Sequence, residues 1–310
     1  MKMTSAILLS AALALTATPA LAGSGGAGRN VAQSAAEVQI EAKALNGTLT
    51  ALYGVGGFSG GNVLVSNGPD GMLIIDDKVP EMTNKLVLKL NEIGGIEKLK
   101  FVLNTHWHFD HAGGNARLGK DAIIVAHANV RKRLSTEQRL DAFNMVLPPQ
   151  PKEAWPVITY EQGASIHFNG EELKLTHLAG GHTDTDSVVY FTESNVLHTG
   201  DLFFNGLFPF VDVQNGGSVT GVMENVAWII AHYPADVTIV PGHGPVATMD
   251  DLKTFHEMLG ETIGHVRDLI AAGRNAEEIK AAGVPAKWKG WAGILNEATW
   301  NAIIHASLTK

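Results

Sequence analysis

The sequence HWHFDH, at residues 106–111, follows directly on the apolar run LKFVLNT. Three imidazoles and one carboxylate lie within these six residues, and both groups are ligands for borderline divalent ions such as zinc. Side chains two apart in an extended segment point the same way, so we expect His106 and His108 to bind one ion together. Asp110 and His111 lie where the chain turns into Ala-Gly-Gly, so we expect them to face a second ion.

Three more candidate ligands follow apolar runs in the same manner and lie next to glycine, in the segments GGHT, TGD and PGHG. Glycine there permits tight turns and close backbone approach. With the first cluster they complete a set for two metal ions. We expect one ion to bind His106, His108 and His182, the other to bind Asp110, His111 and His243, and Asp201 to bridge both.

The motifs HWHFDH, GGHT, TGD and PGHG, in this order, resemble those of the metallo-β-lactamase superfamily over residues 45–245. The resemblance implies an α/β fold of the αββα sandwich type, with the metals at one edge between two sheets, and the same ligand roles. No internal linker divides residues 45–310, so we expect a single domain. Residues 250–310 carry none of the motifs and are expected to form C-terminal helices.

One residue differs from the pattern of a major group of true β-lactamases and narrows the choice among members of the superfamily. Asp201 stands where a major group of true β-lactamases carries a cysteine ligand, and this chain contains no cysteine. Asp201 is instead similar to the bridging aspartate of glyoxalase-II-like, lactonase-like and ribonuclease-Z-like members. A ribonuclease conflicts with the expected export and with the formal net charge of -8.

These observations predict a periplasmic dinuclear zinc hydrolase in which a metal-bridging hydroxide attacks a carbonyl-type bond of an ester, lactone, thioester or lactam. Asp110 is expected to orient the hydroxide and relay a proton. Iron or manganese suits the same ligands. Candidate partners that fix the histidine tautomers are Thr105, Thr183, Asp184, Asp186 and Thr199.

The substrate contacts are predicted from apolar residues near the motifs. The glycine-rich segment 53–61 suggests a flap with Phe58 as an apolar lid, or else an ordinary hairpin turn. Four phenylalanines near Asp201 are expected either to wall an apolar pocket or to pack in the core: Phe203, Phe204, Phe208 and Phe210.

Four other functions compete with this prediction. A true β-lactamase fits the expected export. An iron-dependent persulfide dioxygenase shares the fold, with a single iron held by two histidines and an aspartate. A serine hydrolase would use GFSGG at residues 57–61, but that motif needs a following helix, and the strand-like NVLVS follows instead. A metal-binding protein without catalysis is the fourth.

Residues 1–22 resemble a secretory signal, with Lys2, an apolar run and the cleavage pattern Ala-Leu-Ala, and residues 23–44 are expected to be a flexible arm. The mature protein is therefore expected in the periplasm or outside the cell, without stable membrane insertion. No basic run suits nucleic acid, so the expected partner is a small-molecule substrate. The sequence leaves the oligomeric state open.

The hydrophobic pattern predicts a mixed order of strands and helices. Strands are expected at 49–53, 62–66, 72–76, 99–104, 122–126, 165–168, 173–178, 187–192, 195–198 and 237–240. Helices are expected at 80–93, 128–140, 219–232, 250–272 and from 297 onward, with a loop at 144–156.

Overall fold

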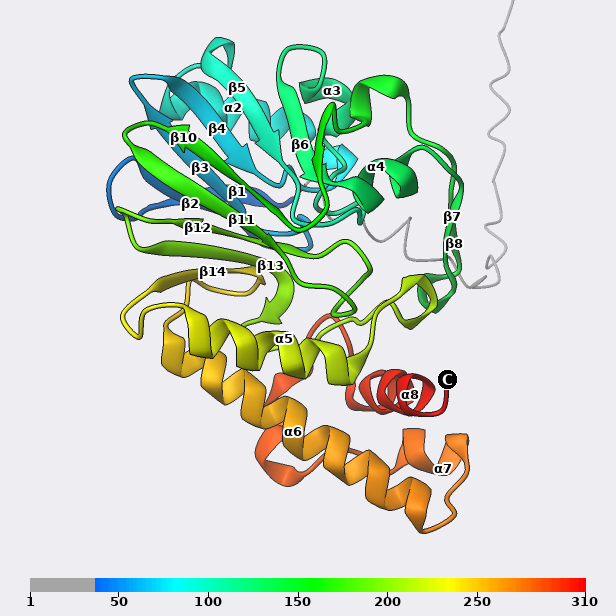
Figure 1. Ribbon diagram of the computed structural model, residues 1–310. Helices are drawn as coiled ribbons and strands as arrows, with labels where there is room; N and C mark the ends of the chain where they lie inside the picture. Colours follow the sequence, from blue (N-terminus) through cyan, green and yellow to red (C-terminus); the bar gives the residue numbers. More distant parts are fainter. Residues whose placement is uncertain (1–36) are drawn as a thin grey trace, which may run out of the picture.

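The computed structural model describes residues 37–310, which form two β-sheets packed face to face between helices (Figure 1). The seven-stranded sheet runs, in spatial order, Gln39–Ala44 (β1), Leu49–Val55 (β2), Val63–Gly68 (β3), Gly71–Ile75 (β4), Leu99–Leu103 (β5), Ile123–His127 (β6) and Ile158–Tyr160 (β9). The five-stranded sheet runs Gly163–Phe168 (β10), Glu171–His177 (β11), Ser187–Phe191 (β12), Val196–Phe204 (β13) and Thr238–His243 (β14). The expected αββα sandwich is confirmed.

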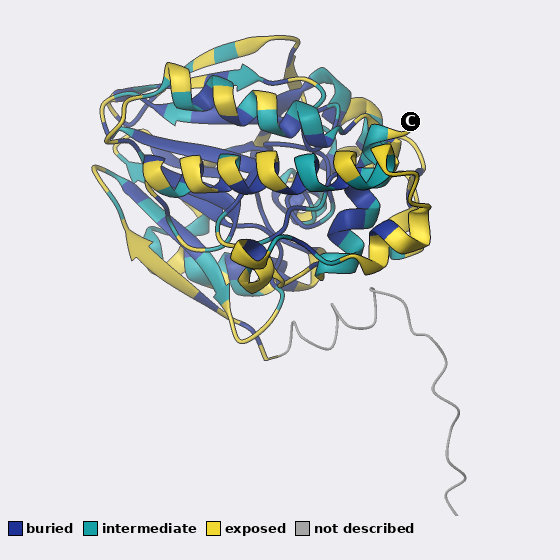
Figure 2. Ribbon diagram, turned by 90° about the horizontal axis from the view of Figure 1, so that it is seen from below, coloured by how far each residue is buried: buried dark blue, intermediate teal, exposed yellow. Residues whose placement is uncertain are grey.

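Helices cover the outer faces of both sheets (Figure 1). They are Thr83–Ile93 (α2), Asn115–Leu118 (α3), Ala128–Leu134 (α4), Val219–His232 (α5), Met249–Ala271 (α6), Ala276–Ala281 (α7) and Glu297–Leu308 (α8). Short 3₁₀ turns lie at Pro80–Met82, Ile96–Lys98, Asp141–Phe143, Lys152–Ala154, Val213–Asn215 and Ala286–Trp291. In Figure 2 the helices on the viewed side carry exposed residues outward and buried residues toward the strands. Within residues 37–310, no helix combines the length and apolarity that crossing a membrane requires.

Burial of apolar side chains explains the layers. Between the sheets, Leu73 and Leu103 of the first sheet and Phe191 and Val240 of the second belong to one buried cluster. Outside the second sheet, a larger cluster joins α5, α6 and α8 to β13. Removing this apolar area from water is the main force that holds helices to sheets.

The strand directions bring the motifs together. β4, β5 and β6 are parallel neighbours, and β13 is parallel to β14. Residues that follow the carboxyl ends of parallel strands meet at one edge of a sheet, and the HWHFDH segment follows β5. The two sheets therefore present their motif-bearing edges to each other.

The structure corrects several sequence-based boundaries. Gln39–Ala44, expected to belong to the flexible arm, forms the edge strand β1 paired with β2. The helix expected over 128–140 ends at Leu134, and the end of that range forms the strand Gln138–Leu140 (β7) instead. This strand pairs with Met145–Leu147 (β8), which lies inside the expected loop. The expected signal peptide and residues 23–36 of the arm lie outside the described residues.

Candidate metal centre

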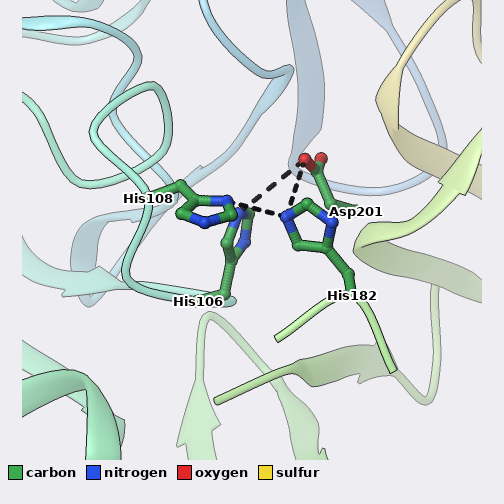
Figure 3. A group of neighbouring side chains, drawn as sticks. All are labelled: His106, His108, His182 and Asp201. Carbon is green, nitrogen blue, oxygen red and sulfur yellow. Dashed lines mark hydrogen bonds and ion pairs between the residues drawn. The ribbon is translucent and has the colours of Figure 1, made fainter. Parts of the chain in front are cut away.

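The structure brings the seven predicted ligand side chains into two adjacent buried clusters. Ligand atoms of the first cluster lie within 4.8 Å of one another: His106, His108, His182 and Asp201 (Figure 3). The second cluster meets the same limit: Asp110, His111 and His243. All seven residues are less than 9% exposed.

The carboxylate of Asp201 lies between the two clusters. Its Oδ2 is 3.3 Å from His182 Nε2 and 3.8 Å from His106 Nε2. Its Oδ1 is 3.0 Å from His111 Nε2 and 3.4 Å from His243 Nε2. One carboxylate thus offers one oxygen to each cluster, which is the geometry of a bridging position.

Gly200 directs Asp201 toward this position. The pairing of β13 with β14 shifts register on both sides of Gly200, whose φ is +51°. A Cβ at Gly200 would lie 2.6 Å from Thr105 Oγ1, too close for any real side chain. Glycine is therefore required on both conformational and steric grounds.

Three ligand histidines are oriented through their Nδ1 atoms. His106 Nδ1 lies 3.0 Å from Thr105 Oγ1. His111 Nδ1 lies 2.7 Å from Asp76 Oδ2, and His182 Nδ1 lies 2.7 Å from the carbonyl oxygen of Phe210. These contacts fix the rings so that each Nε2 faces the cluster.

His108 is oriented the other way round. Its Nδ1 lies 2.8 Å from His182 Nε2, inside the cluster, and its Nε2 lies 3.0 Å from Asp212 Oδ2. Each of these four rings therefore has one nitrogen held by the protein and one turned toward its cluster.

The donor set fits divalent cations. His106 Nε2 is buried and has no hydrogen-bond partner among the described residues, which leaves its lone pair for another ligand. Four imidazoles and two carboxylates surround it, as suits zinc and related borderline ions.

Comparison with known proteins identifies the family. The sequence pattern of the "Metallo-beta-lactamase superfamily" matches residues 56–257. The chain belongs to the metallo-beta-lactamase superfamily.

Curated relatives share part of this superfamily domain. The chain is 31% identical over 146 residues to a hydroxyacylglutathione hydrolase of Polaromonas sp., covering 46% of this chain and 47% of that protein. It is 22% identical over 166 residues to a "Metallo-beta-lactamase type 2" of Bacteroides fragilis, covering 54% and 61%. The chain thus spans about half the length of these relatives.

Solved structures share the superfamily fold. A metallo-beta-lactamase from Pontibacter korlensis superposes with a TM-score of 0.57 at 20% identity, over 72% of this chain and 99% of that one. The sec-alkylsulfatase Pisa1 from Pseudomonas sp. gives 0.59 at 16% identity, over 84% of this chain and 49% of that one. These likenesses show the fold alone.

The pKa values separate the ligand histidines into neutral rings and protonated rings. Burial, aided by His111, holds the pKa of His106 well below its usual value, and burial lowers the pKa of His182 to about 4. Burial also opposes protonation of His111 and His243. The neighbouring carboxylates, Asp201 first and then Asp110, outweigh burial, so the pKa of His111 is raised well above normal and that of His243 to about 9. The protons on these two rings balance a charge that a divalent cation balances instead when it binds.

A glycine-rich segment covers the second cluster. Gly61 N donates to the carbonyl oxygen of Asp110 at 2.9 Å, and a Cβ at Gly61 would collide with the His111 ring. Lys78, fully buried, donates to Gly61 O at 2.9 Å and to Ser59 Oγ at 3.3 Å. Burial lowers the pKa of Lys78 to about 7. The segment is thus fastened to the metal-site turn.

The structure places some of the other predicted site residues beside the ligands and others away from them. Of the five partners expected to fix histidine tautomers, Thr105 contacts a ligand ring. The others have different partners: Thr183 and Asp186 form hydrogen bonds with each other, and Asp184 forms an ion pair with Arg133. Thr199 donates to backbone carbonyl oxygens. Phe58 and Phe204 lie against His243, with ring centroids 6.1 and 4.8 Å away.

The structure corrects the expectation that Phe208 walls an apolar substrate pocket. It is fully buried in the helix-side core and stacks on Trp300 with centroids 6.0 Å apart, so it does not wall the site. Sequence reasoning also missed Asp76, Asp212 and Lys78. The segment LIIDDK, which places three charged residues directly after a buried strand, marks two of them.

Proposed function

We propose that the protein is an exported dinuclear zinc hydrolase that cleaves a carbonyl-type bond, giving an acid and a leaving group from one water. The observation that carries this proposal is the carboxylate of Asp201, which offers one oxygen to each of two histidine-rich clusters. Ions bound there would act as Lewis acids and lower the pKa of a coordinated water to about 7. The signal-like residues 1–22 support export.

Asp110 is the group proposed to hold the reacting proton. Its Oδ2 lies 3.3 Å from His243 Nε2 and 3.7 Å from His111 Nε2. Burial raises the pKa of Asp110, but His111 and His243 outweigh burial and lower it, so the carboxylate is ionised at neutral pH. A charged, fixed carboxylate beside the reacting atoms is suited to accept a proton.

Seven ligand candidates support two ions rather than one. A single iron held by two histidines and an aspartate would leave four of these seven buried donors without a metal partner. This weighs against the persulfide dioxygenase alternative. Zinc, iron and manganese all suit imidazole and carboxylate donors, and we propose zinc because five of the seven donors are imidazoles, a common ligand of zinc.

The relatives favour esters and thioesters as substrates, because hydroxyacylglutathione hydrolases are among the matches of highest identity. A lactam is the second candidate, supported by the matches to proteins named metallo-beta-lactamase. Asp201 in place of cysteine weighs against the cysteine-containing β-lactamases.

The test is hydrolysis of an ester, thioester, lactone and lactam panel, including nitrocefin, by zinc-loaded protein with and without chelator. His108→Ala should abolish turnover and deplete metal without unfolding the sheets. His167→Ala is the matched control, since His167 is exposed on β10 and far from the motifs. Full activity in His108→Ala, or no hydrolysis of any substrate by the loaded wild type, would refute the proposal.

A further inference from the structure

A groove of about 700 Å³ leads away from the second metal cluster, and its walls come from four separate stretches of the chain. His243 lines one part of the groove, together with Phe58 of the glycine-rich segment. Lys43 of β1 and Tyr53 of β2 line another part. The groove therefore joins a candidate metal ligand to the edge of the seven-stranded sheet.

Strand register places Lys43 well away from the metals. Lys43 pairs with Ala51, four residues before Val55, where β2 ends and the glycine-rich segment begins. At roughly 3.3 Å per residue, four residues of strand span about 13 Å. Phe58, in contrast, stacks against His243. The lysine and the metal site thus lie toward opposite ends of the groove.

The C-terminal part of the chain supplies the apolar wall. Ile294 and Gly293 line the groove beside Leu207, and Ile294 is 45% exposed. The wall is firmly held, because Phe208 N donates to Trp291 O at 3.0 Å and Gly293 packs so closely on Leu207 that a Cβ there would collide with it. Ile294 is thus an exposed apolar side chain next to a segment that packs on Leu207, and it offers apolar surface to a ligand.

The charge of the groove is one-sided. Among the described residues that line it, none is Asp or Glu, and Lys43 is the cation that lies apart from the metal ligand His243. The nearby carboxylate of Glu41 accepts a hydrogen bond from Tyr53 Oη at 3.3 Å, and the exposed Lys43 forms no ion pair with a carboxylate among residues 37–310. In a protein of formal net charge -8, this lysine remains available for an anion.

We propose that this groove binds the acyl side of the substrate: an unbranched apolar chain along Phe58, Leu207 and Ile294, ending in an anionic group that pairs with Lys43. The substrate class is then a carbonyl compound with a terminal acid, such as a monoester of a dicarboxylic acid. This inference rests on the proposed hydrolase function, which it deepens.

A binding experiment tests the groove without turnover. Methyl-ketone acids of six to ten carbons, and the matching neutral methyl ketones, are titrated into zinc-loaded protein by calorimetry. We expect one chain length to bind best and its carboxylate to strengthen binding about five-fold, as an exposed ion pair does. Lys43→Ala should remove that advantage, and Lys174→Ala, at an exposed lysine of the other sheet, should keep it.

The apolar wall has its own control. Ile294→Ala should weaken the acid and the ketone alike, about three-fold or more, whereas Ile123→Ala, at a similarly exposed isoleucine of β6, should leave both unchanged. An acid advantage that persists in Lys43→Ala would show that the metals take the carboxylate, and it would overturn the proposal. Equal binding of acid and ketone to the wild type would overturn it as well.

Hydrolysis assays distinguish a failure of the groove proposal from a failure of the proposed hydrolase function. Mono-4-nitrophenyl suberate should be cleaved with a higher kcat/KM than 4-nitrophenyl octanoate, and Lys43→Ala should make the two equal. Hydrolysis of both esters with no effect of Lys43→Ala would overturn the groove and leave the hydrolase standing. Lys43-dependent binding without any hydrolysis would overturn the hydrolase and leave the groove.

Discussion

His108 Nε2 lies 3.0 Å from Asp212 Oδ2, although 104 residues separate them in the chain. Asp212 is itself held by Asn215, whose Nδ2 donates to the same carboxylate at 2.9 Å. The aspartate fixes the imidazole so that Nδ1, rather than Nε2, faces His182. One first-cluster ring thus takes its orientation from a carboxylate that lies outside all four sequence motifs.

Replacing Asp212 should weaken metal binding without removing a ligand. Asp212→Ala frees the His108 ring to rotate, and loss of such a partner lowers metal affinity by roughly 10- to 100-fold. Competition with a chromogenic chelator measures the effect. Asp121→Ala is the control, since Asp121 is exposed and forms an ion pair with Arg117 on the surface, outside both clusters. Equal affinities in the two variants would disprove the role of Asp212.

Gly61→Ala should damage the second cluster selectively. The new Cβ would collide with the His111 ring, while no ligand of the first cluster is among its nearest neighbours. We expect zinc titration to show one site near wild-type affinity and a second that is strongly weakened. Gly264→Ala, in the middle of α6 with open space around it, should leave both sites intact and stabilise the helix by about 1 kcal/mol. Two intact sites in Gly61→Ala would contradict the packing described.

Lys78→Met should change how stability depends on pH. Burial lowers the pKa of Lys78 to about 7, whereas an unfolded lysine keeps its ordinary value of 10.5. Between these values the unfolded state binds the extra proton, so wild-type stability rises with pH from about 7 to 10. Lys78→Met lacks this rise.

Urea unfolding at pH 7 and pH 9.5 measures the difference. The gap in unfolding free energy between the wild type and Lys78→Met should shift in favour of the wild type at the higher pH. The loss of the hydrogen bonds to Gly61 and Ser59 adds an offset that is present at both pH values. A gap that stays constant with pH would show that Lys78 is not perturbed.

Trp300→Ala should destabilise the C-terminal helices. Trp300 is fully buried, and its Nε1 donates to Thr262 Oγ1 at 3.2 Å. Truncating a buried tryptophan costs about 3–5 kcal/mol. Trp300→Phe should cost less, because it keeps most of the stacking on Phe208. Thermal and urea unfolding measure both, and a loss below 1 kcal/mol in Trp300→Ala would contradict the packing.

The seven candidate ligands could be chosen from the sequence because HWHFDH follows a buried strand, and because the other three follow or end apolar runs and stand beside glycine. Asp212 and Asp76 were not predicted because they meet His108 and His111 only through tertiary contacts. The local spacing of residues in the sequence does not reveal such contacts. The edge strand β1 was missed since only Ile40 of its six residues is buried, as is common at a sheet edge. Phe208 was misplaced because apolar residues beside a site and in the core have the same sequence pattern.

The most direct test of the account is the zinc content of the purified protein after loading and removal of excess metal. Seven side chains in two clusters joined by Asp201 predict two zinc ions per chain, and fewer than two in Asp201→Ala. One ion per chain in the wild type, or two in Asp201→Ala with unchanged affinity, would contradict the central claim.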